Sequence, residues 1–172
     1  MIGLQRETVQ VITYQADWHD LFEQERCALH KHIGHLVLDI QHVGSTAVPG
    51  LDAKPILDIA VAVASVAVIP QCQPLLCALG YLDRGDGNEG GYLFVKESAP
   101  DVRTHHLHMV ARDDPQWDNY LRFRDVLKAD ETLRTTYANL KKALQEQFSQ
   151  DRQAYTAAKH AFIRDILQQN KG

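Results

Sequence analysis

The chain has 172 residues, a formal net charge of −4 and a pI of about 6.1. Apolar residues make up 45% and charged residues 23% of it, which is typical of a globular domain and excludes a collagenous, coiled-coil or largely disordered chain. No stretch approaches the roughly 20 apolar residues of a membrane span. The negative charge argues against a general nucleic-acid-binding surface, and the N-terminus has no signal-peptide pattern, so we expect a cytoplasmic protein that does not bind membranes.

The first two thirds of the chain predict a mixed sheet with helices. Alternating and continuous apolar runs indicate strands, a three-and-four spacing indicates helices, and glycine-rich segments indicate turns. The expected order is a strand at Val9–Thr13, a helix capped by Asp17 and ending at Gly34, a strand at His35–Val43, a loop at Gly44–Gly50, a central strand at Lys54–Val63, a helix at Val66–Leu79, a turn at Asp83–Gly91, and a hairpin of Tyr92–Lys96 and Arg103–Val110.

From Asp114 onward the spacing predicts only helices, the first of them capped by Asp114. We therefore expect one domain over residues 1–172, with a core of about 1–112 and a helical extension of about 113–172. Cysteines at three positions, an odd number without a Cys-x-x-Cys spacing, predict reduced thiols that mostly fill the core. These positions are Cys27, Cys72 and Cys77.

Three features carry chemistry. The loop Gly44-Ser45-Thr46 offers close backbone approach and two hydroxyl groups, which suit a phosphate, although such pairs are also common in ordinary turns. Asp58 is a carboxylate inside an apolar strand, so it needs a cation, a metal or hydrogen-bond donors. His106 and His108 lie two positions apart on a strand and project from one face, where they could bind a metal or act as acid and base.

Two cations of the C-terminal helices have a notable spacing. Lys141 and Lys159 each follow a tyrosine by four positions, Tyr137 and Tyr155 respectively, so that each pair shares one helical face. This arrangement suits a base and its phosphates, and it suits simple packing equally well. The three histidines at the end of the first helix, by contrast, are typical of a helix C-terminus; they are His30, His32 and His35.

The stretch from His42 to Val63, HVGSTAVPGLDAKPILDIAVAV, resembles the signature of the GrpB family almost letter by letter. This family is a branch of the DNA polymerase β-like nucleotidyltransferase superfamily. Supporting matches extend the resemblance over nearly the whole chain; they are Trp18 with Phe22 and Glu25, Leu79-Gly80-Tyr81, His106-Leu107-His108, Arg122-Phe123-Arg124-Asp125 with Leu127, Tyr137 with Leu140 and Lys141, and Tyr155 with Lys159, Phe162 and Ile163.

The resemblance implies an α/β (α+β) fold: a nucleotidyltransferase-like mixed sheet flanked by helices, with a helical C-terminal extension. It also implies that Gly44 and Ser45 hold a triphosphate and that Asp58 binds a divalent metal such as Mg²⁺, Mn²⁺ or Zn²⁺. Enzymes of this superfamily carry Asp-x-Asp on that strand. Here the second position is Ala60, which cannot bind a metal, and the single acid is typical of the family.

Three interpretations follow. In the first, Asp58 forms a different metal site with His106, His108 and His42, and the protein transfers a nucleotidyl group to an unknown acceptor. In the second, catalysis was lost, and the protein binds a nucleotide or another phosphorylated small molecule through Ser45, Thr46 and the three lysines Lys54, Lys141 and Lys159. In the third, the domain is structural or binds a partner, with Asp58 paired to Lys54 or Arg124.

Overall fold

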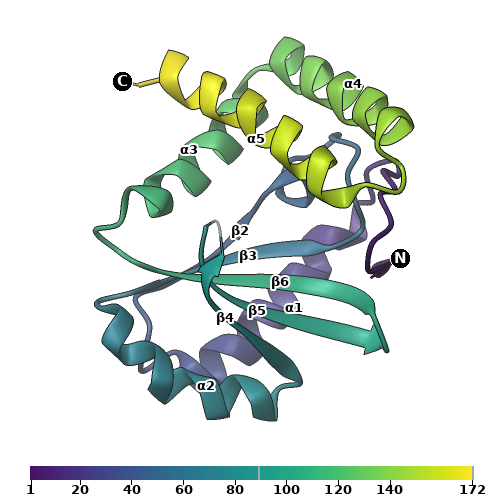
Figure 1. Cartoon of the computed structure of the whole chain (residues 1–172). Helices are drawn as coiled ribbons and strands as arrows, with labels where there is room; N and C mark the ends of the chain where they lie inside the picture. Colours follow the sequence, from purple (N-terminus) through teal and green to yellow (C-terminus); the bar gives the residue numbers. More distant parts are fainter. Residues whose placement is uncertain (89, 172) are drawn as a thin grey trace.

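The computed structural model describes residues 1–88 and 90–171, which form a mixed six-stranded sheet with helices on both faces (Figure 1). The strand order is β2-β3-β6-β5-β4, and the short β1 pairs with the beginning of β6. Only the β3–β6 pairing is parallel within the described part of the chain. The strands are β1 Leu4–Gln5, β2 Asp39–Val43, β3 Leu57–Val63, β4 Tyr81–Asn88, β5 Gly91–Ala99 and β6 Val102–Ala111.

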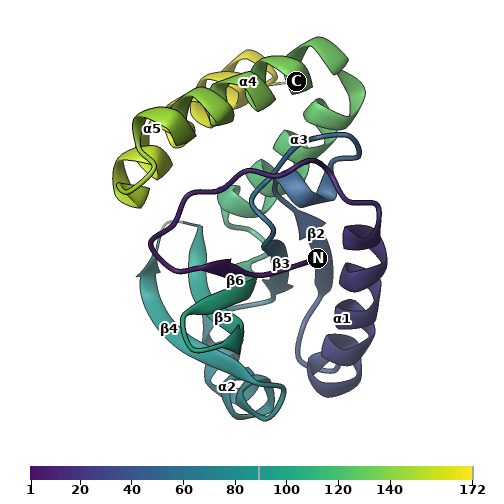
Figure 2. The same cartoon turned by 90° about the vertical axis from the view of Figure 1, so that its right-hand side faces the viewer.

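The helices form two groups on opposite sides of the sheet. In Figures 1 and 2 the three C-terminal helices lie together above the sheet, while α2 lies below it and α1 runs along the other face. The helices are α1 Asp17–Ile33, α2 Ile69–Ala78, α3 Pro115–Ala129, α4 Glu131–Gln147 and α5 Arg152–Gln169, with short 3₁₀ turns at Ser45–Ala47 and Val66–Val68.

Strand β3 is central because both of its faces are covered. Its odd-numbered residues, such as Ile59 and Val61, are fully buried in the main core with α1 and α2. Its even-numbered residues Ala60 and Ala62 pack against Trp117 of α3. The continuous apolar run therefore correctly predicted a buried central strand, and the even-numbered face carries Asp58.

The C-terminal helices have a core of their own. Val48 and Leu51, from the segment between β2 and β3, pack with Phe123, Leu127 and Tyr137 of α3 and α4. The predicted cap is confirmed, since Asp114 accepts a hydrogen bond from the Gln116 amide at 2.8 Å. The sheet ends at Ala111 and the helices begin at Pro115. Among the described residues, no helix combines the length and apolarity needed to cross a membrane.

The N-terminal expectations need correction. Val9–Thr13 is not a strand; in this segment only Ile12 forms a bridge, to Ala53, while the sheet pairing occurs earlier, in β1. Asp17 does not cap α1 but begins it, and its carboxylate contacts the N-terminal amine at 3.3 Å. Helix α1 does end at Gly34 as predicted.

Three further expectations differ from the structure. The strand expected from His35 begins only at Asp39, because the preceding residues form turns whose side chains pack on the core. The expected turn Asp83–Gly91 is largely strand β4, in which a register shift at Gly85 (φ +83°) accommodates the glycine-rich sequence; Glu89 lies outside the described residues. All three cysteines are free, but only Cys72 is buried, whereas Cys27 and Cys77 are exposed.

Candidate metal and phosphate site

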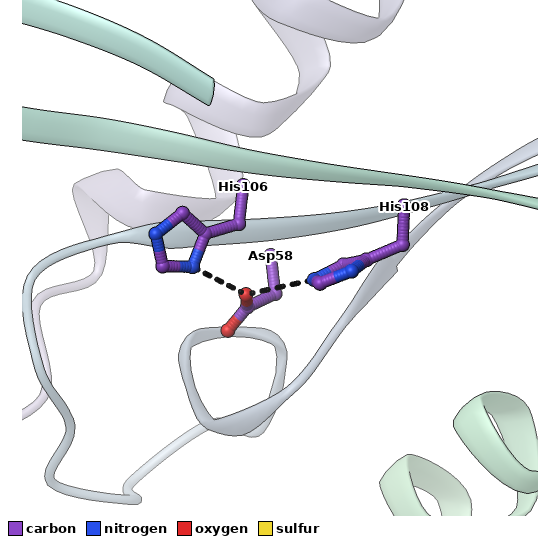
Figure 3. A group of neighbouring side chains, drawn as sticks. All are labelled: Asp58, His106 and His108. Carbon is purple, nitrogen blue, oxygen red and sulfur yellow. Dashed lines mark ion pairs between the residues drawn. The ribbon is translucent and has the colours of Figure 1, made fainter. Parts of the chain in front are cut away.

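The parallel pairing of β3 with β6 places one carboxylate beside two imidazoles. Asp58 is opposite His106 and Ala60 is opposite His108 in this ladder, so all four side chains project from the same face. Figure 3 shows both imidazoles pointing at the Asp58 carboxylate. The sequence prediction that His106 and His108 share a face with Asp58 therefore agrees with the geometry.

The distances in this cluster fit a metal better than hydrogen bonds. Asp58 Oδ1 lies 3.4 Å from His106 Nδ1 and 3.6 Å from His108 Nε2, which is long for a hydrogen bond. In a tetrahedral site with bonds of about 2.1 Å, neighbouring ligand atoms lie about 3.4 Å apart. One ligand atom from each of the three residues lies within 4.8 Å of the others, so the set fits a single divalent ion.

The charge states of His106 and Asp58 at neutral pH also suit metal binding. Burial lowers the pKa of His106 to about 4, against the opposing effect of Asp58, so its imidazole is neutral at pH 7 and able to bind a metal. Burial by itself would raise the pKa of Asp58, but its interactions with the two histidines hold that pKa well below 3.8. Asp58 is therefore a carboxylate at neutral pH.

The Gly44 loop folds directly over this carboxylate. Val43 pairs with Asp58 across β2 and β3, so the chain turns beside it at Gly44 (φ +71°). A Cβ at position 44 would lie 2.7 Å from Asp58 Oδ2. Glycine is required here for both its conformation and its size. The turn continues into Ser45, whose hydroxyl faces the C-terminal helices.

Three lysines converge on the same place from three segments. Lys141 of α4 donates a hydrogen bond to Ser45 Oγ at 2.9 Å and another to the Asp52 carbonyl oxygen. Lys54 and Lys159 lie 5.4 and 5.7 Å from the ring centre of Tyr155. The expected pairing of lysine with tyrosine on α4 and α5 is thus present, with Lys141 lying 4.8 Å from the Tyr137 ring centre.

Burial disfavours the charged form of each of these three lysines. Burial, followed by repulsion from Lys159, lowers the pKa of Lys141 to about 7 and that of Lys54 well below 10.5. Burial also lowers the pKa of Lys159 itself. Among the described residues that line the cavity between these lysines, the only carboxylate is Asp58. Positive charge is therefore in excess, as expected where an anion binds.

These side chains enclose a cavity of about 70 Å³ between the sheet and the C-terminal helices. Its polar walls come from the Ser45 turn, the strand ends and both helices. The lining residues with groups able to bind a phosphate or a metal are Ser45, Lys54, Asp58, His106, Lys141 and Lys159. The structure thus unites the predicted phosphate-binding lysines with the predicted metal ligands.

One predicted metal ligand is placed differently. His42 lies on the opposite face of β2 from Asp58, where its ring stacks on Phe22 at 4.6 Å, so it does not join the metal cluster. Thr46 does line the cavity, and its hydroxyl lies 2.9 Å from His42 Nε2. The alternation of side chains along β2 explains the position of His42, because His42 and Val43 must face opposite sides.

The structure also shows contacts that the sequence did not reveal. Tyr120 of α3 lies against His108, with ring centres 5.5 Å apart, and donates a hydrogen bond to the Gly90 carbonyl oxygen at 2.9 Å. Arg124 does not pair with Asp58. It donates hydrogen bonds to Gln41 Oε1 and to the His42 carbonyl oxygen, and so fixes α3 to the edge strand.

Comparison with known proteins agrees with this geometry. The family model described as GrpB protein matches residues 8–169. The glutamate-rich protein GrpB of Alkalihalophilus pseudofirmus is 35% identical over 97% of this chain and 98% of its own. The crystal structure of the conserved protein GrpB from Enterococcus faecalis superposes with a TM-score of 0.82 at 32% identity, covering 93% of this chain and 98% of that one.

More distant similarity lies with nucleotidyltransferases. A structure of the Cid1 poly(U) polymerase with Mg 3′-dATP bound has a TM-score of 0.57 at 14% identity. It covers 86% of this chain, which corresponds to 49% of the polymerase chain. At this level of identity the likeness concerns the fold alone, and it identifies the fold as nucleotidyltransferase-like.

Proposed function

Because the chain belongs to the GrpB family, we propose that it is a cytoplasmic, nucleotidyltransferase-related enzyme that uses a divalent metal. Its substrate is a nucleoside triphosphate, and the nucleotidyl group passes to an acceptor hydroxyl. One observation carries the proposal: three lysines line one cavity together with Asp58 and His106, two members of the Asp-His-His cluster. Anionic phosphates and a metal ion are the ligands that such a combination attracts.

The roles of the residues follow from their positions. Asp58, His106 and His108 would hold the metal, which supplies charge stabilisation at the reacting phosphate. The Ser45 hydroxyl and the surrounding lysine ammonium groups bind and orient the phosphates. In the transfer, a bond forms between the acceptor oxygen and the α-phosphorus while the bond to pyrophosphate breaks, and the hydroxyl proton passes to solvent.

The chemistry of the three proposed ligands indicates which metal ion the site prefers. Two imidazoles and one carboxylate suit Zn²⁺ or Mn²⁺ better than Mg²⁺, which prefers oxygen ligands. Ala60 lies opposite His108 in the β3–β6 ladder, at the position of the second acid in Asp-x-Asp. We propose that His108 and His106 replace that acid, so one metal is held where related enzymes hold two.

Ala60 also supports a second candidate, a protein that binds the nucleotide without catalysis. Its fully buried side chain packs with Trp117, so the second acid has no substitute at its own position. The structural alternative receives less support. The side chains nearest to the Asp58 carboxylate are those of His106 and His108, while Arg124 donates its hydrogen bonds to Gln41 and the His42 carbonyl oxygen.

The first experiment is a binding one. Calorimetric titration of Mn²⁺, Zn²⁺ and Mg²⁺, each alone and then with ATP, measures whether metal and nucleotide strengthen each other. We expect Asp58→Asn and His106→Ala to weaken Mn²⁺ binding at least about tenfold, since each removes one of three ligands. His30→Ala removes an exposed imidazole on α1 and is the matched control. Equal metal affinity in wild type and Asp58→Asn would contradict the proposed metal site.

The second experiment distinguishes enzyme from binder. Nucleoside triphosphates labelled at the γ-phosphate are incubated with the protein, the best metal and candidate acceptors, and release of labelled pyrophosphate is followed. The proposal predicts release that Asp58→Ala abolishes. Nucleotide binding without release would favour the non-catalytic candidate, and release that survives Asp58→Ala would rule out the proposed mechanism.

A further inference from the structure

We infer that the sheet face beside the metal cluster carries an anion site at Arg103, which binds a carboxylate or phosphate group of the acceptor. As a statement about the acceptor, this inference rests on the proposed function and narrows it: the acceptor carries an anionic group in addition to its hydroxyl. The anion site itself follows from three observations on Arg103, namely the face on which it lies, its lack of a hydrogen-bond partner and the charges around it.

Arg103 lies on the same face of the sheet as the metal ligands. In the β5–β6 ladder it is opposite Glu97, and His106 is opposite Val95. Val95 and Glu97 are two positions apart on β5 and therefore share a face. A register shift between the two pairs gives β6 one extra residue, so that Arg103 and His106 also face the same way. They are separated by about 10 Å along β6, at about 3.3 Å per residue, which a small molecule can span.

The guanidinium group of Arg103 is buried without a hydrogen-bond partner at Nε. Arg103 is 8% exposed, and among the described residues no group accepts a hydrogen bond from this nitrogen. The carboxylate opposite is not a substitute, because Glu97 Oε1 is itself without a hydrogen bond and lies 3.7 Å from Arg84 Nη2. Leaving such a buried donor unsatisfied is costly. A carboxylate or phosphate would accept hydrogen bonds from a guanidinium in a two-pronged arrangement.

The charges around Arg103 are mainly positive. Burial, and then repulsion from Arg152, lowers the pKa of Arg103, while Glu97 opposes this shift. Arg152 begins α5 and also repels Lys54 and Lys159, which line the cavity. Arg103 and the cavity are therefore neighbours that share the influence of one cation. Positive charge gathered here, in a chain with a net charge of −4, favours an anionic ligand.

A binding experiment tests the anion site without metal or nucleotide. Two-dimensional NMR follows the arginine Cδ–Hδ groups, which do not exchange with water, while inorganic phosphate or acetate is added. The Arg103 signal is identified as the one missing from Arg103→Lys. We expect this signal to move in a saturable way with a midpoint in the millimolar range. An Arg103 signal that does not move with either anion at about 50 mM would overturn the inference.

A variant of the opposing carboxylate distinguishes an anion site from an internal ion pair. Glu97→Gln removes the negative charge that competes with the ligand, so the phosphate midpoint of the Arg103 signal should fall at least about threefold. Arg6→Gln is the control, because Arg6 is half exposed and pairs with Glu7 at 3.3 Å. Its midpoint should change less than about twofold. An unchanged or higher midpoint in Glu97→Gln would overturn the inference, since Arg103 would then serve the fold alone.

A second titration separates this inference from the proposed function. Phosphate is added in the presence of saturating ATP and Mg²⁺, which does not broaden the signals as Mn²⁺ would. An acceptor site should keep its midpoint within about threefold. A midpoint raised at least about tenfold would overturn the inference, because the nucleotide would then occupy Arg103 itself. If ATP does not bind with any metal, the proposed function fails and the acceptor assignment with it, whereas the first titration still decides whether the anion site exists.

Discussion

Replacing Lys141 with methionine should make the ligand-free protein more stable at pH 7, although it removes a hydrogen-bonded side chain. Lys141 is 2% exposed, and burial with repulsion from Lys159 lowers its pKa from 10.5 to about 7. Its ammonium group is thus disfavoured by folding. Methionine has a similar length and no charge, so it relieves this destabilisation.

The magnitude follows from the pKa. A fall from 10.5 to about 7, at about 1.4 kcal/mol per pH unit, corresponds to about 5 kcal/mol, of which about 4 applies at pH 7. The variant loses the hydrogen bonds to Ser45 and to the Asp52 carbonyl, which offsets about 2 kcal/mol. The net gain is about 2 kcal/mol, or a rise of about 4–8 °C in Tm for a chain of this size.

The pH dependence provides a sharper signature. Since the folded pKa is depressed, the unfolded chain binds more protons between pH 7 and 10.5, and the stability of the wild type rises with pH in that window. The advantage of the methionine variant should therefore shrink to about zero near pH 9. Urea denaturation of both proteins at pH 7, 8 and 9, without metal or nucleotide, measures this difference.

The adjacent lysine supplies the control. Lys142→Met removes a half-exposed ion pair with Asp52 and should destabilise by less than about 1 kcal/mol. A Lys141→Met protein that is less stable than wild type by the same amount at every pH would refute the reasoning. It would show that Lys141 acts as a tether between α4 and the Ser45 turn.

Three more predictions concern the same region. Gly44→Ala should weaken Mn²⁺ binding at least about tenfold, because the new Cβ would displace Asp58. Gly50→Ala is the control: position 50 also has a positive φ (+79°), but its new Cβ meets open space, so this variant should only destabilise the fold by about 1 kcal/mol. Arg124→Ala should lower the free energy of unfolding by about 1–3 kcal/mol in urea titrations, since it leaves the His42 carbonyl oxygen without this donor. ATP affinity, measured by calorimetry in excess Mn²⁺, should fall as pH rises above about 7, because phosphate binding requires the protonated ammonium group of Lys141. An affinity that is unchanged at about pH 8.5 would contradict this.

The pattern of apolar residues and glycines correctly predicted helices and strands whose buried and exposed positions differ clearly in polarity. The apolar run around Ile59 predicted the central strand, and the glycine after α1 predicted its end. Periodicity failed where the backbone depends on distant partners. The segment Asp83–Gly91 has the composition of a turn, yet pairing with β5 makes most of it a strand. Such a pairing is a tertiary interaction, and local sequence does not encode it.

The sequence predicted those parts of the candidate site that depend on the alternation of side chains between the two faces of a strand. Spacing placed His106 and His108 on one face, and the same rule, applied to His42 beside Val43, would have excluded His42 from the cluster. The assembly of the three lysines was inferred from the family resemblance. Spacing alone could not bring Lys54 next to Lys159, because the packing of α5 over the sheet brings them together.

The single parallel pairing of the sheet has a consequence for the order of folding. Strands β2 and β3 form one hairpin, and β4, β5 and β6 form a meander; both are built from antiparallel neighbours close in sequence. The β3–β6 contact joins Asp58 to His106 across the whole of α2 and the meander. Contacts between such distant residues close slowly. We expect both halves to form before they meet, so that the metal ligands come together only when the sheet is complete.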